Sequence, residues 1–161
     1  MDTLFNQLPL FANLTAQQRA ILLPLFTCTR CLADQTIFEQ GSRAEYLFIL
    51  VEGDVAVQFK PDDAPAINVS QIRPGQVFGW SAAFGSGVYT SGAVCTIPST
   101  LLRVRGADLR TLRQKYPETG ILILKRLAEL VAERLEGSHR HSQVVAMLDH
   151  ALENGVKPIG G

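Results

Sequence analysis

Hydrophobic and polar positions follow one pattern in the middle of the chain and another at its two ends. Between Thr27 and Val104, short apolar or alternating runs recur and are separated by turn-forming residues. Many short runs punctuated in this way predict an antiparallel β-sandwich or barrel. Glu52-Gly53-Asp54 separates two of the runs and predicts a tight hairpin. The predicted strands are Thr36–Phe38, Leu47–Val51, Val55–Phe59, Ile67–Ile72, Val77–Phe78, Ala93–Ile97 and Leu101–Val104.

Both ends of the chain have helical spacing. Thr15 precedes Gln18 by three residues, which is the spacing of a capping box, and predicts a helix over Ala16–Leu23 that Pro24 ends. After the strands, the pattern predicts a short helix over Ala107–Lys115 and a long one from Glu118 to at least Leu135, with Pro117 in its first turn.

The long helix has a wider apolar arc than one core contact needs. Two rows of side chains form this arc at 100° per residue. One interpretation buries both rows in the helix's own domain. The other, which we favour because few elements remain to cover both rows, places one row against the barrel and the other against a second copy of the chain. Whether the helix continues through Gly137 stays open. The first row is Ile121, Leu124, Ala128, Val131 and Leu135, and the second is Ile123, Leu127 and Leu130.

Composition narrows the function classes. The 161 residues include 15 Lys plus Arg and 15 Asp plus Glu, so the net charge of zero argues against a surface that wraps nucleic acid. The start of the chain lacks the features of a secretory signal, and no apolar run is long enough to span a membrane. Three cysteines are an odd number and fit a reducing, cytoplasmic location.

The sequence offers no arrangement typical of catalysis or metal binding. Cys28 and Cys31 are three apart, and in a strand such positions face opposite sides. His139, His141 and His150 all lie outside the predicted β region. No Ser/His/Asp set, paired carboxylates or phosphate-binding P-loop is evident, so we expect neither an enzyme nor a metal site.

Four local motifs in this order resemble the cyclic-nucleotide-binding domain of the Crp/Fnr superfamily. They are Leu8-Pro9-Leu10-Phe11, Ile37-Phe38-Glu39-Gln40-Gly41, the run Leu47–Val57 and Pro74-Gly75-Gln76-Val77-Phe78-Gly79. The resemblance implies an α+β fold, an antiparallel β-roll or jelly roll (double-stranded β-helix) with N-terminal helices and a long C-terminal helix. The predicted domain covers residues 1–153, with the β-roll at 27–104, the C-terminal helices at 107–153 and a flexible tail at 154–161.

The resemblance also implies partners. In this family the last helix pairs two subunits, so we expect a homodimer through the helix that starts at Glu118. Crp/Fnr regulators add a DNA-binding domain, but only 13 residues follow Leu148, and such a domain needs about 50. The chain therefore resembles the sensor half of such a regulator, without nucleic-acid binding of its own.

Family members bind the cyclic phosphate with backbone N–H groups, an Arg and a neighbouring Ser or Thr, and the ribose with a Glu. Here Gly79 matches, but Trp80 stands at the Glu position and Tyr89, within one residue, at the Arg position. Pro74 to Leu102 contains no charged residue. Losing an Arg–phosphate bond forfeits roughly 1.5–3 kcal/mol, so binding of cyclic AMP or cyclic GMP is in doubt. The candidate ligand-binding residues are Phe78, Gly79, Trp80, Ser81, Ala82, Tyr89, Thr90, Ser91 and, from the last helix, Arg134.

Three hypotheses follow. A regulatory sensor would bind a small ligand here and pass the signal to the last helix, and its structure should show an open cavity beneath Gly79–Ala82 and Tyr89–Ser91. A ligand-free scaffold or dimerisation module should instead show Trp80 or Tyr89 packed into that space. A third alternative is the sensor half of a longer transcription regulator.

Overall fold

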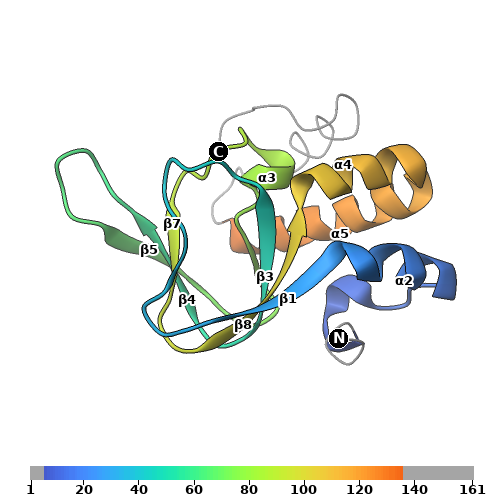
Figure 1. Cartoon of the computed structure of the whole chain (residues 1–161), viewed down its shortest axis with the longest axis horizontal. Coiled ribbons are helices and arrows are strands. Elements are labelled where there is room, and N and C mark those ends of the chain that lie inside the picture. Colours follow the sequence, from blue (N-terminus) through green and yellow to red (C-terminus); the bar gives the residue numbers. More distant parts are fainter. Residues whose placement is uncertain (1–5, 136–161) are drawn as a thin grey trace.

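The computed structural model describes residues 6–135, which form a β-roll covered at one end by helices (Figure 1). Eight strands belong to two antiparallel four-stranded sheets, with the orders β1-β8-β3-β6 and β2-β7-β4-β5. The strands are β1 (Phe26–Cys31), β2 (Thr36–Phe38), β3 (Tyr46–Glu52), β4 (Val55–Phe59), β5 (Ile67–Ile72), β6 (Val77–Phe78), β7 (Gly92–Cys95) and β8 (Ser99–Arg105). This is the antiparallel roll that the sequence predicts.

The helices also match the sequence pattern closely. They are the 3-10 turns η1 (Pro9–Phe11) and η2 (Leu23–Leu25) and the helices α2 (Ala16–Leu22), α3 (Ser81–Phe84), α4 (Gly106–Lys115) and α5 (Pro117–Arg134). The predicted capping box is confirmed, because Thr15 and Gln18 exchange hydrogen bonds between side chain and backbone at the start of α2. The questions of a helix through Gly137 and a tail at 154–161 concern residues outside the described part.

The predicted hairpin at Glu52-Gly53-Asp54 is wrong. Strands β3 and β4 follow each other in the chain but lie in different sheets, so this turn carries the chain from one sheet to the other. Gly53 has a φ of +116°, and a Cβ there would lie 2.7 Å from the Cα of Ser99. The Asp54 N–H donates to Ser99 Oγ at 3.1 Å, which ties the turn to the start of β8.

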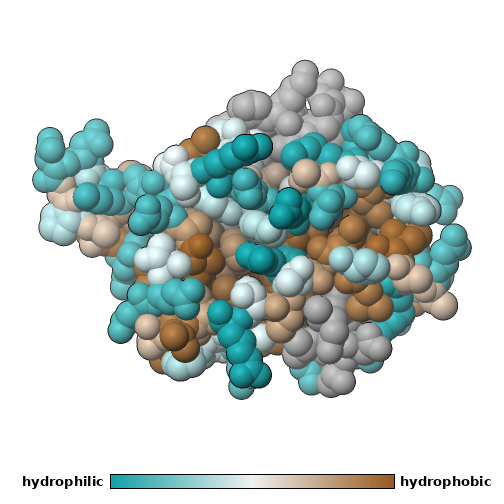
Figure 2. Space-filling model, viewed as in Figure 1, coloured by the Kyte–Doolittle hydropathy of each residue, from teal (hydrophilic) through white to brown (hydrophobic). Residues whose placement is uncertain are grey.

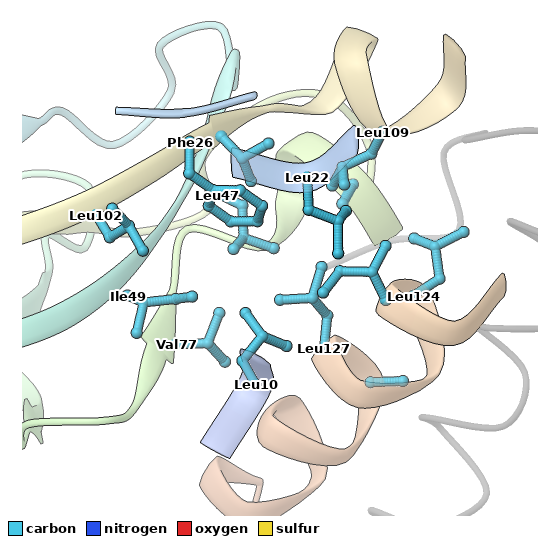
Figure 3. Close-up of a cluster of buried hydrophobic side chains, with 14 of the residues drawn as sticks. Leu10, Leu22, Phe26, Leu47, Ile49, Val77, Leu102, Leu109, Leu124 and Leu127 are labelled. Carbon is cyan, nitrogen blue, oxygen red and sulfur yellow. The ribbon is translucent and has the colours of Figure 1, made fainter. Parts of the chain in front are cut away.

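Two apolar clusters hold the layers together. One fills the space between the two sheets, and the other lies between the sheet β1-β8-β3-β6 and the helices. Figure 3 shows side chains of the second cluster pointing toward one another from strands and helices, among them Leu47, Leu102 and Leu127. Cys28 packs against the helical cluster and Cys31 belongs to the cluster between the sheets, which confirms that they face opposite sides.

Helix α5 packs against its own domain with much of its apolar arc. Members of both predicted rows are buried, among them Leu124, Leu127 and Val131. Arg126 ties the helix to the N-terminal segment by donating to the carbonyl oxygens of Leu10 at 2.9 Å and Ala12 at 2.7 Å. The interpretation in which both rows are buried within one domain therefore accounts for most of the arc.

The surface view shows hydrophilic residues over the projecting tip between β4 and β5 (Figure 2). Within residues 6–135, no helix combines the length and the apolar character that crossing a bilayer requires.

Candidate functional site

The segment from Val77 to Ser91, here called the cassette, leaves one sheet and enters the other through a short buried helix. Strand β6 pairs with β3, and Gly79 then turns the chain with a φ of +71°, a conformation that favours glycine. The N–H groups of Ala83 and Phe84 donate to the Trp80 carbonyl oxygen at 2.9 and 2.8 Å and start α3. All four residues of α3 are buried, so this helix is a fixed wall of the site.

The return loop of the cassette is held against the connection between β2 and β3. The N–H of Tyr89 donates to the Ser42 carbonyl oxygen at 2.9 Å, and the N–H of Gly41 donates to the Tyr89 carbonyl oxygen at 2.7 Å. The N–H of Ala44 donates to the Gly87 carbonyl oxygen at 2.7 Å. These backbone bonds set the position of the loop without any charged group.

Tyr89 reaches inward from this loop and makes its own hydrogen bonds. Its hydroxyl donates to the Tyr46 carbonyl oxygen at 2.6 Å and accepts from the Tyr46 N–H at 3.2 Å. Its ring stacks on Phe38, with centroids 3.7 Å apart and planes 12° apart. Burial raises the pKa of the Tyr89 phenol to about 12, so the group is neutral at physiological pH. Tyr89 is therefore a packed, uncharged residue rather than a substitute for the family's arginine.

The space beneath Gly79 is filled by aromatic rings of the chain itself. Phe48 stacks on Phe78 with centroids 5.2 Å apart, and Phe38 lies between this pair and Tyr89. A Cβ placed on Gly79 would lie 3.1–3.3 Å from atoms of Phe38, Phe48 and Tyr89. The packed Tyr89 is what the scaffold hypothesis expects.

Arg134 connects the last described turn of α5 with the cassette. Its guanidinium lies 5.1 Å from the centre of the Trp80 ring. One of its nitrogens donates to the Val77 carbonyl oxygen at 3.1 Å and another to Ser70 Oγ at 2.8 Å. Burial lowers the pKa of this guanidinium to about 10, which still leaves it charged at neutral pH. We call these three contacts the Arg134 bridge.

The remaining predicted site residues are spread over the cassette. Ser81 is buried and accepts a hydrogen bond from the Gly87 N–H through its carbonyl oxygen, while Ala82 is buried in α3. Thr90 is exposed and Ser91 is half-buried. The structure thus brings Trp80 and Arg134 together, and places Tyr89 and Phe78 in the aromatic cluster on the other side of Gly79.

Sequence reasoning missed two residues that shape this region. Phe38 was part of a recognised motif, but nothing indicated that its ring would stack on Tyr89. Ser70 lies in β5, where the alternating pattern says which face it is on and not that an arginine 64 residues away would reach it. Across residues 6–135, no group of three or more His, Cys, Asp or Glu is placed to hold a metal ion.

The model of the cyclic nucleotide-binding domain family matches residues 29–116, which is more than half of the chain. The chain belongs to this family. The match runs from β1 through the cassette to the end of α4, and the antiparallel roll with a long helix after it is the family's fold.

The chain also aligns with curated relatives and with solved structures. The chain is 29% identical over 115 residues to the cAMP-activated global transcriptional regulator CRP of Pasteurella multocida. That alignment covers 71% of this chain and 53% of the regulator, so the chain spans about half the length of that curated relative. It is similar in structure to a protein from Geobacter metallireducens assigned as cyclic nucleotide-binding, with a TM-score of 0.71, 27% identity and coverage of 84% of this chain and 97% of that one.

The regulatory subunit of a cAMP-independent protein kinase A from Trypanosoma brucei has the same fold, with a TM-score of 0.64 and 17% identity over 80% of this chain and 46% of that one. A variant of that subunit with three substitutions, one of them from threonine to arginine, is bound to cAMP in its A site.

Proposed function

We propose that this cyclic-nucleotide-binding domain is a non-enzymatic sensor in which α5 reads the occupancy of the cassette through Arg134. The Arg134 bridge is the observation that supports this. A single side chain of α5 contacts the Trp80 ring, β5 and β6 at once. A ligand that takes over any of these contacts changes the free energy of the present α5 position, which is what coupling between a site and a helix requires.

The chemistry around the bridge favours a flat, anionic ligand. Trp80 is a half-buried aromatic ring, and the Arg134 cation lies over one of its faces. A nucleotide combines a planar base with a phosphate and would use both groups. Because Trp80 and Tyr89 replace the family's Glu and Arg, we propose weaker binding of cyclic AMP or cyclic GMP than is usual in the family.

The scaffold hypothesis is retained as the second candidate because of one observation. Tyr89 is buried against Phe38 and hydrogen-bonded in both directions, so part of the interior is already filled. In this alternative the cassette binds nothing, and the domain acts through dimerisation or a protein partner. The cAMP-independent kinase subunit shows that this fold also occurs in a protein that does without cAMP.

We further propose that the domain acts as a homodimer through α5 in a reducing compartment, as the sensor part of a longer regulator or as a partner of one. The half-buried Leu122 and the exposed Lys125 and Glu129 lie on one stripe of α5, and Leu122 is not among the side chains packed against the helical cluster, which supports the dimer. Its three cysteines are free, which supports the location. The relationship to CRP supports the regulatory role.

The deciding experiment is a titration of the domain with cyclic AMP, cyclic GMP and cyclic dinucleotides. Melting temperature and the fluorescence of Trp80, the single tryptophan of the chain, are recorded together. We expect one ligand to raise the melting temperature in a saturable way and to change the fluorescence, because binding to the folded state stabilises it. The variant Arg134→Gln should weaken the binding of this ligand, whereas Lys115→Gln, at an exposed position at the end of α4, should not.

Two other outcomes would contradict parts of the proposal. No shift at millimolar nucleotide would overturn the nucleotide-sensor proposal and leave the scaffold. Binding that Arg134→Gln does not weaken would retain a ligand but refute the proposed coupling through the Arg134 bridge.

A further inference from the structure

A groove lies on the outer side of the cassette, between the cassette loop at residues 85–87 and the start of α4. Its volume is about 450 Å³, which is within the size range of small-molecule sites. The connection between β2 and β3 lines it with Arg43 and Glu45, and the end of β8 and the start of α4 line it with Arg105 and Arg110. The loop Gly85-Ser86-Gly87 forms a third side.

The charges in this groove are unbalanced in a chain whose net charge is zero. Three guanidinium groups line it and one carboxylate, Glu45, accompanies them. All four of these residues are exposed, and within the described part of the chain no ion pair joins Glu45 to Arg43, Arg105 or Arg110. Arg110 keeps donors available, because it uses only one nitrogen, for a long hydrogen bond of 3.5 Å to the Ala82 carbonyl oxygen. The Arg105 guanidinium lies over the Tyr46 ring, 5.4 Å from its centre, which is a contact with the ring face and not with a hydrogen-bond acceptor.

The backbone adds to the positive potential. Helix α4 begins at Gly106, so the N-terminal end of its dipole opens into the groove. Gly87 has a φ of +82°, and a Cβ there would meet nothing within 4 Å, so the loop leaves open space. The loop therefore leaves room for a ligand beside the three arginines, while the N–H groups of Gly87 and Gly106 are already bonded to the carbonyl oxygens of Ser81 and Glu45.

We propose that this groove binds a small ligand that carries a dianionic phosphate or pyrophosphate group. Three guanidiniums against one carboxylate leave a charge surplus that a dianion neutralises. The planar forks of arginine match phosphate oxygens in pairs, which a lysine would not do. The groove is distinct from the Trp80 and Arg134 surface and shares none of those residues.

Occupancy of the groove is transmitted to the cassette through α3. The carbonyl oxygen of Ala82 accepts from Arg110, and Gly106 lies so close that an added Cβ would come within 2.8 Å of the Ala82 carbonyl carbon. Helix α3 is therefore part of the cassette and also lines the groove through Ala82, so a ligand that draws on Arg110 acts on the backbone of α3.

The test is calorimetric titration of the domain with inorganic pyrophosphate at low salt, and again at higher salt. We expect saturable binding that weakens as salt rises, because the arginines are exposed and screened. The variant Arg105→Gln should lower the affinity about tenfold or more, since it removes charge-assisted hydrogen bonds. The matched control Arg30→Gln removes an exposed arginine of β1 outside the groove and should leave the affinity unchanged.

A substitution that removes negative charge from the groove provides a second test, because it should raise the affinity for pyrophosphate. Glu45→Gln removes the carboxylate from the groove and should tighten pyrophosphate binding, whereas Glu52→Gln, at an exposed position of β3, should not. Arg134→Gln should leave pyrophosphate binding unchanged, so this site and the proposed cassette function fail or succeed separately.

Three results would overturn the proposal. The first is the absence of saturable binding at millimolar pyrophosphate. The second is an equal loss of pyrophosphate affinity in Arg105→Gln and Arg30→Gln. The third is arginine-dependent binding of an acidic peptide by a domain that does not bind pyrophosphate. The last result would identify the groove as a protein-docking surface.

Discussion

Tyr89 lies in the loop of the cassette, and its side chain is nevertheless part of the protein's core. Its ring takes a place in the interior beside Phe38, and its hydroxyl is satisfied by the backbone of Tyr46. The loop that carries it keeps its bonds to the connection between β2 and β3. The position at which the family resemblance predicts an arginine thus contributes to the core here.

Replacing Tyr89 by Phe tests this role. The variant leaves the Tyr46 carbonyl oxygen without its donor, so we expect it to lower the free energy of unfolding by about 1–2 kcal/mol. The wild-type phenol has a folded-state pKa of about 12, above the ordinary 10.0, so its contribution is complete below pH 10 and is lost as pH rises toward 12.

Denaturant unfolding at neutral pH and between these two pKa values measures both effects. The difference in stability between wild type and Tyr89→Phe should shrink at the higher pH. Cys95, whose pKa burial also raises to about 12, titrates in both proteins and cancels in this comparison. A difference that stays constant with pH would contradict the assignment.

The sequence placed Tyr89 in the site but could not show what it does there. Its hydrogen-bond partner, Tyr46, lies 43 residues away, and no local pattern reports such a contact. For Arg134, in contrast, the sequence suggested the contact that the structure shows. The family resemblance predicted that it lies near the cassette, and the structure places its guanidinium over the Trp80 ring.

At the scale of elements, the sequence pattern predicted where most strands lie but not how they pair. Val55–Phe59, Ile67–Ile72 and Val77–Phe78 are confirmed to the residue. Strand β1 was missed as a separate run because Thr27, Thr29 and Arg30 interrupt its apolar positions. Alternation fixes the face that a side chain occupies and leaves the neighbouring strand undetermined, which is why the turn after β3 was mistaken for a hairpin.

The turn after β3 requires glycine at position 53, and substitution there should lower the stability of the protein. In Gly53→Ala the new methyl group meets both an unfavourable φ of +116° and the backbone of Ser99, so we expect a loss of more than 2 kcal/mol of stability. Gly41→Ala is the matched control, because its φ is +86° but nothing lies within 4 Å of its Cβ, and about 1 kcal/mol is expected. Urea unfolding of both variants measures the gap, and equal losses would show that Ser99 does not constrain the turn.

At the scale of the whole molecule, the open question is what covers the outer stripe of α5. The proposed dimer would bury the half-buried Leu122 between the α5 helices of two copies. Leu122→Lys should therefore shift the protein to monomers, whereas Ala20→Lys, an exposed position of α2, should not. Light scattering after size-exclusion chromatography measures the mass, and a wild-type protein that stays monomeric at high concentration would refute the dimer.

The crossing of the chain between sheets also governs how the protein forms during synthesis. Strand β1 bonds along its whole length to β8, from Phe26 opposite Val104 to Cys31 opposite Ser99, and β8 is also the neighbour of β3. The ribosome therefore releases β1 and β3 long before the strand that joins them is translated. Such distant pairings fold slowly and leave strand edges open in the meantime. The nascent domain should be most prone to aggregation or chaperone capture until residues 99–105 leave the exit tunnel.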